Sequence, residues 1–351
     1  MVYQGIIHQY KDLLEIPQNI KAISLSEGNT PLIPVPRVAE ALGARFNLFI
    51  KFEGLNPTGS FKDRGMTTAV SEAVLRGAKT VICASTGNTA ASAAAYAARA
   101  NMRAVVIIPA GKVAVGKLAG AIAYGADVLQ IDGSFDDALT LVIRISEKHP
   151  IALVNSLNPF RLQGQKTAAF EICDALGHAP DWLALPVGNA GNITAYWMGF
   201  TQYNTLKNTH LPQLLGVQAA GAAPLVLGHP IEKPETVATA IRIGKPARGE
   251  EALLAAQASN GMIISATDEE ILSAQTLLAA SGIWVEPASA AGIAGLRKKI
   301  TNGTINLEGK QVVAVCTGHG LKDPDIITAK FRQPKILPPD LTILEEEILH
   351  G

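Results

Sequence analysis

The stretch "NPTGSFKDRG" at residues 56–65 places a lysine where a helix is predicted to begin. Pro57 and Gly59 predict a turn, and Ser60 is a common helix N-cap, so Lys62 falls in the first helical turn. A helix N-terminus repels an ammonium group, at a cost of about 0.3–1 kcal/mol near the surface. In one interpretation, Lys62 is a surface lysine whose stem directs its charge into solvent. In the other, the repulsion favours a free amine, which can form a Schiff base with an aldehyde.

The glycine–asparagine loop "VGNAGN" at residues 187–192 is a second candidate site. Gly188 and Gly191 permit positive φ angles, which turn successive N–H groups toward an anion. The helix-like "ITAYWMGF" that follows would add the positive charge of its N-terminus. The loop predicts a phosphate site, with an ordinary Gly/Asn turn as the alternative. Neither G-x-G-x-x-G nor G-x-x-x-x-G-K-[ST] occurs, so dinucleotide and P-loop fingerprints are absent.

Polar side chains also follow two other apolar runs. In "STGNTAAS" the hydroxyls of Ser85, Thr86 and Thr89, with exposed N–H groups, could hold a carboxylate. Alternatively, Ser85 or Thr86 only caps the helix that follows. In the loop "NSLNPFR" Arg161 presents a planar fork that suits a phosphate, although a lone loop arginine is more often a solvated surface group.

Histidines and cysteines give no metal-site or catalytic-triad pattern. The seven histidines form no H-x-x-x-H pair, and no G-x-S-x-G elbow occurs, so we interpret His319 as a structural loop residue. Cys83, Cys173 and Cys316 lie far apart, which argues against a disulfide framework and against zinc. We expect no metal, and buried cysteines in a reducing cytoplasm.

Short apolar runs alternate with helix-length stretches along the whole chain. The runs are "TVICAS", "AVVIIPA", "DVLQI", "IALVNS", "WLALPVG", "LLGVQAA", "GMIIS" and "QVVAVCTG". Uniformly apolar strands that alternate with helices predict an open, mostly parallel α/β sheet covered on both faces. A TIM barrel is the second choice. Ligands of open α/β sheets bind at the carboxyl ends of the strands, where the polar loops above begin.

Charge and hydropathy exclude several classes of function. Lys+Arg and Asp+Glu both number 30, so the net charge is zero and no broad nucleic-acid surface is expected. No uninterrupted apolar stretch is long enough for a membrane span, and the N-terminus does not resemble a signal peptide. The acidic, amphipathic C-terminal tail is expected to pack on the surface or on a neighbouring subunit.

Four stretches in a fixed order carry a family resemblance: "NPTGSFKDRG", "ASTGNTAASAAAYAA", "PVGNAGN" and "EPASAAG". Together they resemble the pyridoxal-phosphate enzymes of fold type II, the tryptophan-synthase-β type. Within this superfamily, "EGNTPL", "NSLNPFR" and "TGHGLKDP" are most similar to the threonine synthases. The resemblance implies two open parallel-sheet α/β domains with pyridoxal 5'-phosphate in the cleft between them. The large domain would comprise residues 1–54 and 158–351, and the small domain residues 55–157.

The resemblance also implies a role for each matching residue. Lys62 would form the imine with the cofactor and move protons. The other cofactor contacts would be Asn88 at the phenolic oxygen, Thr317 at the pyridine nitrogen and, around the phosphate, Gly188, Asn189, Ala190, Gly191 and Asn192. The substrate contacts would be Ser85, Thr86 and Thr89 for the α-carboxylate, and Asn155, Ser156, Arg161 and Asn189 for the substrate phosphate. Lys112 is a further candidate contact.

The implied reaction converts O-phospho-L-homoserine and water to L-threonine and phosphate. The nearest alternative is a threonine or serine dehydratase, which would leave "NSLNPFR" without a phosphate to bind; O-acetylserine sulfhydrylase ranks third. A non-catalytic sensor, which needs no imine, is the alternative from another class. We expect a homodimer, as is common in the family, with no nucleic-acid or membrane partner. The short stretch before "EGNTPL" leads us to expect no allosteric extension of the plant type.

Overall fold

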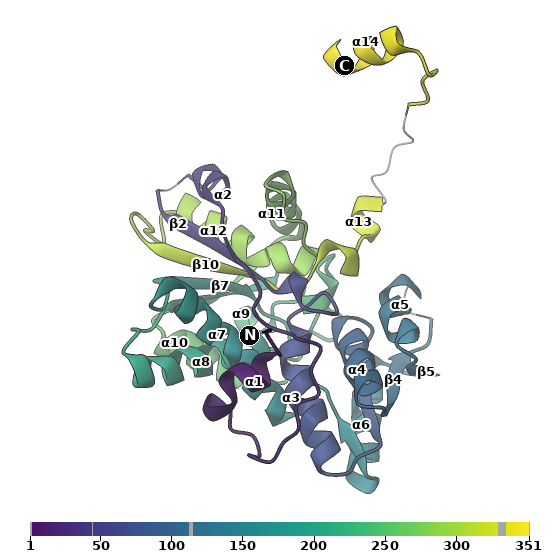
Figure 1. Ribbon diagram of the computed structural model, residues 1–351. Helices are drawn as coiled ribbons and strands as arrows, with labels where there is room; N and C mark the ends of the chain where they lie inside the picture. The colour runs from purple at the N-terminus through teal and green to yellow at the C-terminus, as the bar shows by residue number, and fades with distance from the viewer. Residues whose placement is uncertain (1, 44, 112–114, 329–334, 351) are drawn as a thin grey trace.

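Ten strands form two separate sheets in the computed structural model, which describes all residues except 1, 44, 112–114, 329–334 and 351 (Figure 1). The six-stranded sheet has the order β1 (Leu32–Pro34), β2 (Asn47–Phe52), β10 (Gln311–Cys316), β7 (Trp182–Pro186), β8 (Gln213–Ala219) and β9 (Met262–Ala266). The four-stranded sheet has the order β5 (Asp127–Ile131), β4 (Arg103–Pro109), β3 (Thr80–Ala84) and β6 (Ile151–Leu153). The α/β prediction is confirmed, and two open sheets exclude the TIM barrel.

The helices complete the layers around these sheets. Along the first half of the chain they are α1 (Ile6–Tyr10), α2 (Pro36–Ala41), α3 (Lys62–Leu75), α4 (Asn88–Arg99), α5 (Val115–Ala123), α6 (Phe135–Lys148) and α7 (Pro159–Leu176). The later ones are α8 (Gly191–Lys207), α9 (Pro224–Leu227), α10 (Gly249–Ala258), α11 (Asp268–Ala280), α12 (Ala291–Thr301), α13 (Asp325–Thr328) and α14 (Leu341–His350). The 3₁₀ turns are η1 (Lys11–Leu13), η2 (Glu53–Leu55), η3 (Thr239–Ile241), η4 (Pro287–Ala290) and η5 (Gly320–Lys322). No described helix is both long and apolar enough to cross a membrane.

All eight apolar runs form strands, but the sequence analysis missed β1 and β2. β1 is short, and its pairing with β2 is the only antiparallel pairing among the described strands. β2, "NLFIKF", contains the charged Lys51, which is buried all the same. A charged residue inside a run conceals the apolar pattern on which strand prediction depends.

Alternate residues of β10 belong to two different cores. Val312 and Ala314 pack with α2, α11 and α12, whereas Val313 and Val315 pack with α1, α7, α8 and α10. Figure 1 shows these helix groups on opposite faces of the six-stranded sheet. Both faces are therefore buried, which explains why the central strands are apolar at every position.

The four-stranded sheet is covered in the same way by α3, α4 and α5 on one face and α6 on the other. Its strands all lie between residues 80 and 153. The limits of 55–157 for a small domain remain a prediction.

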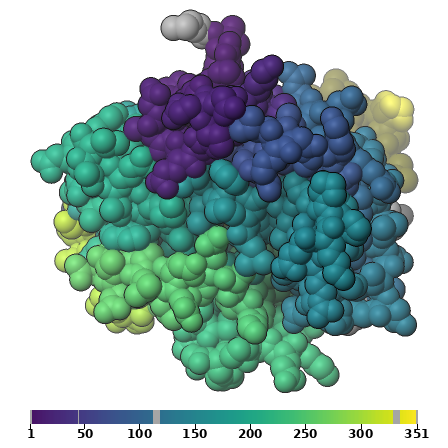
Figure 2. All heavy atoms as spheres, turned by 90° about the horizontal axis from the view of Figure 1, so that it is seen from below, coloured from purple at the N-terminus to yellow at the C-terminus, as the bar shows by residue number. Residues whose placement is uncertain are grey.

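The N-terminal segment contacts a helix on the six-stranded sheet and a helix on the four-stranded sheet. In α1, the ring of Tyr10 packs edge-on against Phe170 of α7, with ring centres 5.3 Å apart. Farther along, the Glu27 carboxylate accepts a hydrogen bond of 2.8 Å from the Tyr96 hydroxyl of α4. Figure 2 shows this segment, in purple, lying across the teal and blue parts of the surface.

The C-terminal helix α14 stands apart from the body of the chain (Figure 1). Leu341, Ile348 and Leu349 are all more than two-thirds exposed. The tail therefore does not pack on the surface of its own chain, and contact with a neighbouring subunit remains a prediction.

A buried ionic network joins α3 to the six-stranded sheet and to α7. Arg64, at 0% exposure, donates to Glu53 at 2.7 and 2.8 Å and to Glu171 at 2.7 and 2.6 Å. Lys51 of β2 donates to the same Glu171 at 2.7 Å. Two cations thus face two carboxylates. Burial alone would raise the pKa of Glu171, but Arg64 and Lys51 outweigh burial and lower this pKa to about 2.

We predict that Glu171→Gln lowers the free energy of unfolding by about 3–5 kcal/mol, because it leaves two buried cations with one carboxylate. Denaturant unfolding of the full chain measures this loss. The matched control is Asp127→Asn, which breaks the exposed ion pair with Arg103 and should cost less than about 1 kcal/mol. Equal effects of the two variants would contradict a stabilising role for the network.

Candidate active site

Lys62 is the first residue of α3, but Ser60 does not cap the helix as predicted. The N-cap is Phe61, no side chain caps the N-terminus, and the buried Ser60 hydroxyl has no described partner. The reason is tertiary: Ser60 forms an isolated bridge with Gly318, and the Phe61 N–H donates to the Thr317 carbonyl at 2.9 Å. The chain after β10 therefore positions the start of α3 and brings Lys62 beside Thr317.

The amine of Lys62 has an unusual electrostatic environment. Burial lowers the pKa of Lys62 to about 7, with a further lowering by the charge of Arg161 that Glu286 opposes. An ordinary lysine, with a pKa near about 10.4, is almost fully protonated at neutral pH. Lys62 is half-buried, so the surface-lysine interpretation does not hold. With a pKa of about 7, a large fraction of the Lys62 side chains carry a free amine at neutral pH.

Two glycines bring Lys62 and Arg161 together. A Cβ atom at Gly164 of α7 would lie 1.8 Å from the Arg64 carbonyl oxygen, and one at Gly65 of α3 would lie 2.9 Å from the Arg161 carbonyl oxygen. Only glycine permits this close contact between the backbones of α3 and α7. The contact explains how two residues 99 positions apart share one site.

The glycine–asparagine loop joins β7 to α8, but its glycines do not adopt positive φ angles. Ala190, the N-cap of α8, does so instead, with φ 66° and ψ −6°. Gly188 instead packs tightly, because a Cβ there would lie 3.1 Å from the Ile241 Cα and crowd it. A left-handed alanine costs roughly 1–2 kcal/mol, and such strain is concentrated at functional sites.

This loop presents hydrogen-bond donors that are not used within the described residues. No side chain caps the N-terminus of α8, and the buried Nδ2 of Asn192 has no partner. Two hydrogen bonds fix Asn189: its Oδ1 accepts from the Ala247 N–H at 3.4 Å, and its backbone carbonyl accepts from the Arg248 N–H at 3.3 Å. Free donors at a helix N-terminus are a suitable environment for a phosphate.

Arg161 lies in the first turn of α7 rather than in a loop. Its side chain is buried, Nη1 donates to the Val154 carbonyl at 3.2 Å, and Nε has no described partner. Burial lowers the pKa of Arg161 to about 10, and the charge of Arg248 contributes. The solvated-surface interpretation is therefore wrong. A buried guanidinium with an unused N–H is a binding group for an anion.

Asn155 connects this region to the turn at residues 85–89. Its amide accepts from the Ala84 N–H at 3.0 Å and donates to the Ala84 carbonyl at 2.9 Å, so it fixes the end of β6 to the end of β3. The amide still has one N–H for a ligand. The neighbouring Ser156 is half-buried.

The turn at residues 85–89 leaves the N-terminus of α4 without a side-chain cap. Gly87 is the N-cap, and Ser85 accepts from the Gly87 N–H at 3.3 Å, so the capping alternative for Ser85 and Thr86 is wrong. Thr86 and Thr89 are half-buried. Hydroxyls and free N–H groups are thus available together, as a carboxylate site requires.

Asn88 and Thr317 each contact a residue of the "EPASAAG" stretch, to whose members the sequence analysis gave no role. Asn88 Nδ2 donates to both carboxylate oxygens of Glu286 at 3.0 Å. The Thr317 hydroxyl lies 2.9 Å from the Ser289 hydroxyl. The sequence predicts neither contact, because the partners are 198 and 28 residues apart along the chain.

Arg248, the N-cap of α10, is a further residue that sequence reasoning missed. Its Nε donates to the Ser156 carbonyl at 3.2 Å, its Nη2 to the Leu157 carbonyl at 3.3 Å, and its Nη1 to Glu251 at 3.1 Å. Its backbone N–H donates to the Asn189 carbonyl, so Arg248 connects the loop before α7 to the loop before α8. No sequence motif marks it.

The remaining candidates have structural roles or cannot be placed. His319 stacks on Phe52 and accepts from the Leu321 N–H at 3.2 Å, in agreement with a structural role. Lys112 lies outside the described residues. The three cysteines are buried, and the described part of the chain contains no His/Cys/Asp/Glu group that could hold a metal.

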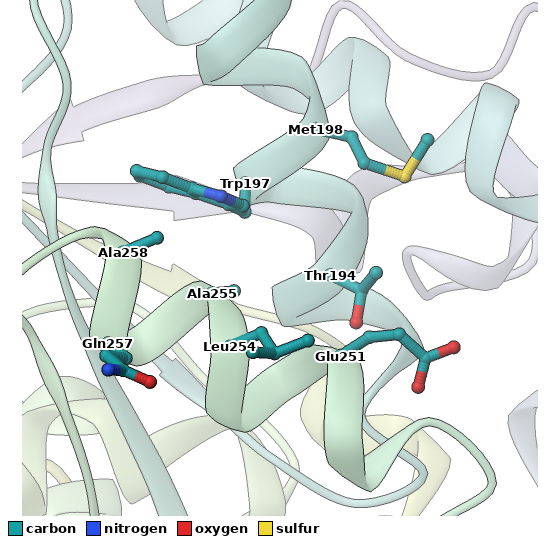
Figure 3. Close-up of a pocket in the computed structure, with 8 residues that line it drawn as sticks. All are labelled: Thr194, Trp197, Met198, Glu251, Leu254, Ala255, Gln257 and Ala258. Carbon is teal, nitrogen blue, oxygen red and sulfur yellow. The ribbon is translucent and has the colours of Figure 1, made fainter.

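A surface groove of about 580 Å³ lies between α8 and α10. Figure 3 shows Trp197 and Met198 of α8 and Leu254 of α10 along its lining, with Glu251 at one end. The groove contains none of the predicted site residues and no concentration of polar groups, so it is not the candidate active site.

A family model for "Pyridoxal-phosphate dependent enzyme" matches residues 23–318 of the chain. The chain is 56% identical to a threonine synthase of Halalkalibacterium halodurans over 99% of its own length and 98% of the relative. It is 57% identical to a threonine synthase of Synechocystis sp. over 97% of its length and 90% of the relative.

The fold is similar to that of a threonine deaminase isoform from Solanum lycopersicum, with a TM-score of 0.73 and 24% identity. That match covers 93% of this chain and 89% of the deaminase. At this identity the likeness concerns the fold alone.

We predict that Lys62 of the cofactor-free chain titrates near pH 7, so an amine-directed reagent labels it at pH 8 well before ordinary lysines. Arg161→Gln should move this midpoint to higher pH, because removing a neighbouring positive charge favours the ammonium form. The control is Arg103→Gln, at an exposed ion pair, which should leave the midpoint unchanged. Peptide mass spectrometry across a pH series measures the labelling, and a Lys62 midpoint near pH 10 would contradict the interpretation.

Proposed function

The chain belongs to the pyridoxal-phosphate-dependent enzymes and, within them, to the threonine synthases, and we propose that its substrate is O-phospho-L-homoserine. The family model and relatives above half identity over nearly the whole chain support this assignment. The enzyme is thus a lyase of amino-acid biosynthesis that uses pyridoxal phosphate and releases phosphate as L-threonine forms.

The described residues fit the cofactor. The uncapped N-terminus of α8 and the unpartnered Asn192 amide would hold its phosphate, together with the backbone of residues 188–191. Lys62 would hold its aldehyde carbon, Asn88 its phenolic oxygen and Thr317 its ring nitrogen. When bound, pyridoxal phosphate supplies an aldehyde that takes up amino groups and a conjugated ring that delocalises negative charge from Cα.

Lys62 is the proton carrier in this proposal. Its Nζ, with a pKa lowered to about 7 by burial, can take the Cα proton of the substrate near neutral pH and later return it. The hydrogen bond from the Phe61 N–H to the Thr317 carbonyl fixes the start of α3, and with it the backbone position of Lys62.

The buried Arg161 guanidinium is the observation that carries the substrate assignment. Arg161 is buried next to Lys62 with an unused Nε, and its charge has no carboxylate partner among the described residues. A phosphate dianion on the substrate would supply the missing negative charge. Asn155 and Ser156 lie in the loop before α7, and Arg248, which donates to the carbonyls of Ser156 and Asn189, links Asn189 to that loop. Ser85, Thr86 and Thr89 would hold the α-carboxylate. A dehydratase substrate has no phosphate and would leave Arg161 without an anion.

Neutral hydroxyls at the ring nitrogen fit an elimination and hydration enzyme. Thr317 bonds to Ser289 rather than to a carboxylate, so the ring nitrogen would not be held fully protonated. A weaker electron sink disfavours transamination. In this scheme the substrate loses protons at Cα and Cβ, phosphate leaves from Cγ, and Cγ gains a proton to become the methyl group. The hydroxyl of water then adds at Cβ, its proton is released, and Lys62 reprotonates Cα.

The assembly and motions belong to the same proposal. The chain would act as a homodimer in the cytoplasm, with no nucleic-acid or membrane partner. The domain of residues 55–157 would move against the rest of the chain to exclude bulk water during turnover.

We predict that the chain converts O-phospho-L-homoserine to equal amounts of L-threonine and phosphate. Borohydride should fix a pyridoxyl group on Lys62, and Lys62→Ala should abolish turnover while the chain remains folded. Lys298→Ala, at a surface ion pair with Glu270, is the matched control and should retain full activity. Amino-acid analysis, phosphate release and peptide mass spectrometry give these readouts. Faster formation of 2-oxobutanoate from L-threonine would instead identify a dehydratase.

We predict that Arg161→Ala raises the KM for O-phospho-L-homoserine by about 10- to 100-fold, because one charge-assisted contact with phosphate contributes roughly 1.5–3 kcal/mol. The affinity for pyridoxal phosphate should change far less, since a different loop holds the cofactor. Steady-state kinetics and a cofactor titration separate the two effects, with Arg103→Ala, at the exposed ion pair with Asp127, as the surface control. Equal losses for substrate and cofactor would show that the two anion sites are assigned wrongly.

A further inference from the structure

Glu286 is a buried carboxylate to which the proposed function gives no direct task. It is 3% exposed and directly precedes η4, and its backbone N–H donates to the Gly318 carbonyl at 3.1 Å. The same glycine makes room for the carboxylate, because a Cβ there would lie 2.5 Å from Glu286 Oε1. The position of the carboxylate is therefore fixed by the backbone that also carries Thr317.

The contact with Asn88 fixes the orientation of a side-chain amide. Asn88 Nδ2 lies 3.0 Å from both oxygens of Glu286. The two N–H bonds of an amide diverge, so the carboxylate takes one of them and leaves the other for a ligand. A flipped amide would place its oxygen against the carboxylate and be repelled. Without Glu286, either orientation would be available to Asn88.

We propose that Glu286 is a positioning residue of the cofactor site: it holds the Asn88 amide with its free N–H toward the phenolic oxygen and places negative charge beside Lys62. The inference depends on the proposed cofactor contacts of Lys62 and Asn88, but not on the identity of the substrate.

The charges around Glu286 support this role. Lys62 and Lys322 attract its carboxylate, whereas Asp323 repels it. Burial raises the pKa of Glu286, and the Asn88 hydrogen bond and the two lysines oppose that rise. The like charge of Arg161 also acts on Lys62 and disfavours its protonated form. Removing the charge of Glu286 would leave the protonated form of Lys62 without its stabilising neighbour.

The test compares E286Q with E270Q in the full chain loaded with pyridoxal phosphate. Glu270 is a surface carboxylate paired with Lys298, so E270Q controls for loss of one negative charge. For E286Q we expect the pH midpoint of the visible cofactor band to fall by about one unit. We also expect kcat to fall about 10- to 100-fold, as for a misplaced reacting group, and the cofactor to bind less tightly. E270Q should match the unmodified chain in all three measurements.

A double-variant cycle tests whether Glu286 acts through Asn88. If it does, N88A/E286Q binds the cofactor no more weakly than N88A alone. Additive losses, or an E286Q spectrum and cofactor affinity equal to those of E270Q, would overturn the inference. If E286Q does not fold, E286D decides: it keeps the charge but shortens the reach, so the midpoint should stay while cofactor affinity falls, and unchanged affinity would overturn the role. Threonine formation by the unmodified chain tests the proposed function separately.

Discussion

The buried pairing of Arg64 with Glu53 and Glu171 is the interaction on which the rest of the structure depends. These three side chains come from α3, η2 and α7. Removing any one of them would leave a buried charge without its partner. Arg64 is two residues after Lys62 in α3, and Glu171 lies in α7, whose first turn contains Arg161. The network therefore holds the two helices that carry the proposed base and the proposed phosphate-binding group in one fixed relation, with the glycine contact between α3 and α7 setting their distance.

The central strands could be predicted because burial on both faces leaves a purely local signal, an uninterrupted apolar run. β2 escaped prediction for the opposite reason. Its Lys51 is tolerated in the sheet only because Glu171, 120 residues away, neutralises it. The local sequence pattern contains no information about such a distant partner. A buried lysine therefore looks like an exposed one, and the strand that contains it is not predicted.

The loops of the candidate site could be placed from the strand ends, but their local geometry could not. Ser60 is a better cap than Phe61 in isolation, and glycine is a better left-handed residue than alanine. In both cases tertiary contacts overrode propensity: the chain after β10 holds Ser60 in an extended bridge, and Gly188 packs tightly against Ile241. Arg161 was expected in the loop that follows an apolar run, whereas proline at the first helical position begins α7 two residues before it. Glu286 and Arg248 act through contacts between distant segments, which no motif records.

The N-terminal segment that crosses both layers has a mechanical consequence. Its first helix is embedded against α7, while its later residues are bonded to α3 and α4. In the proposed closure, rotation of the four-stranded sheet relative to the six-stranded sheet would stretch this strap or carry it along, so the strap would limit the amplitude of the motion. The range of opening would then be set by residues that have no part in the proposed chemistry and that a survey of the chemistry alone would omit.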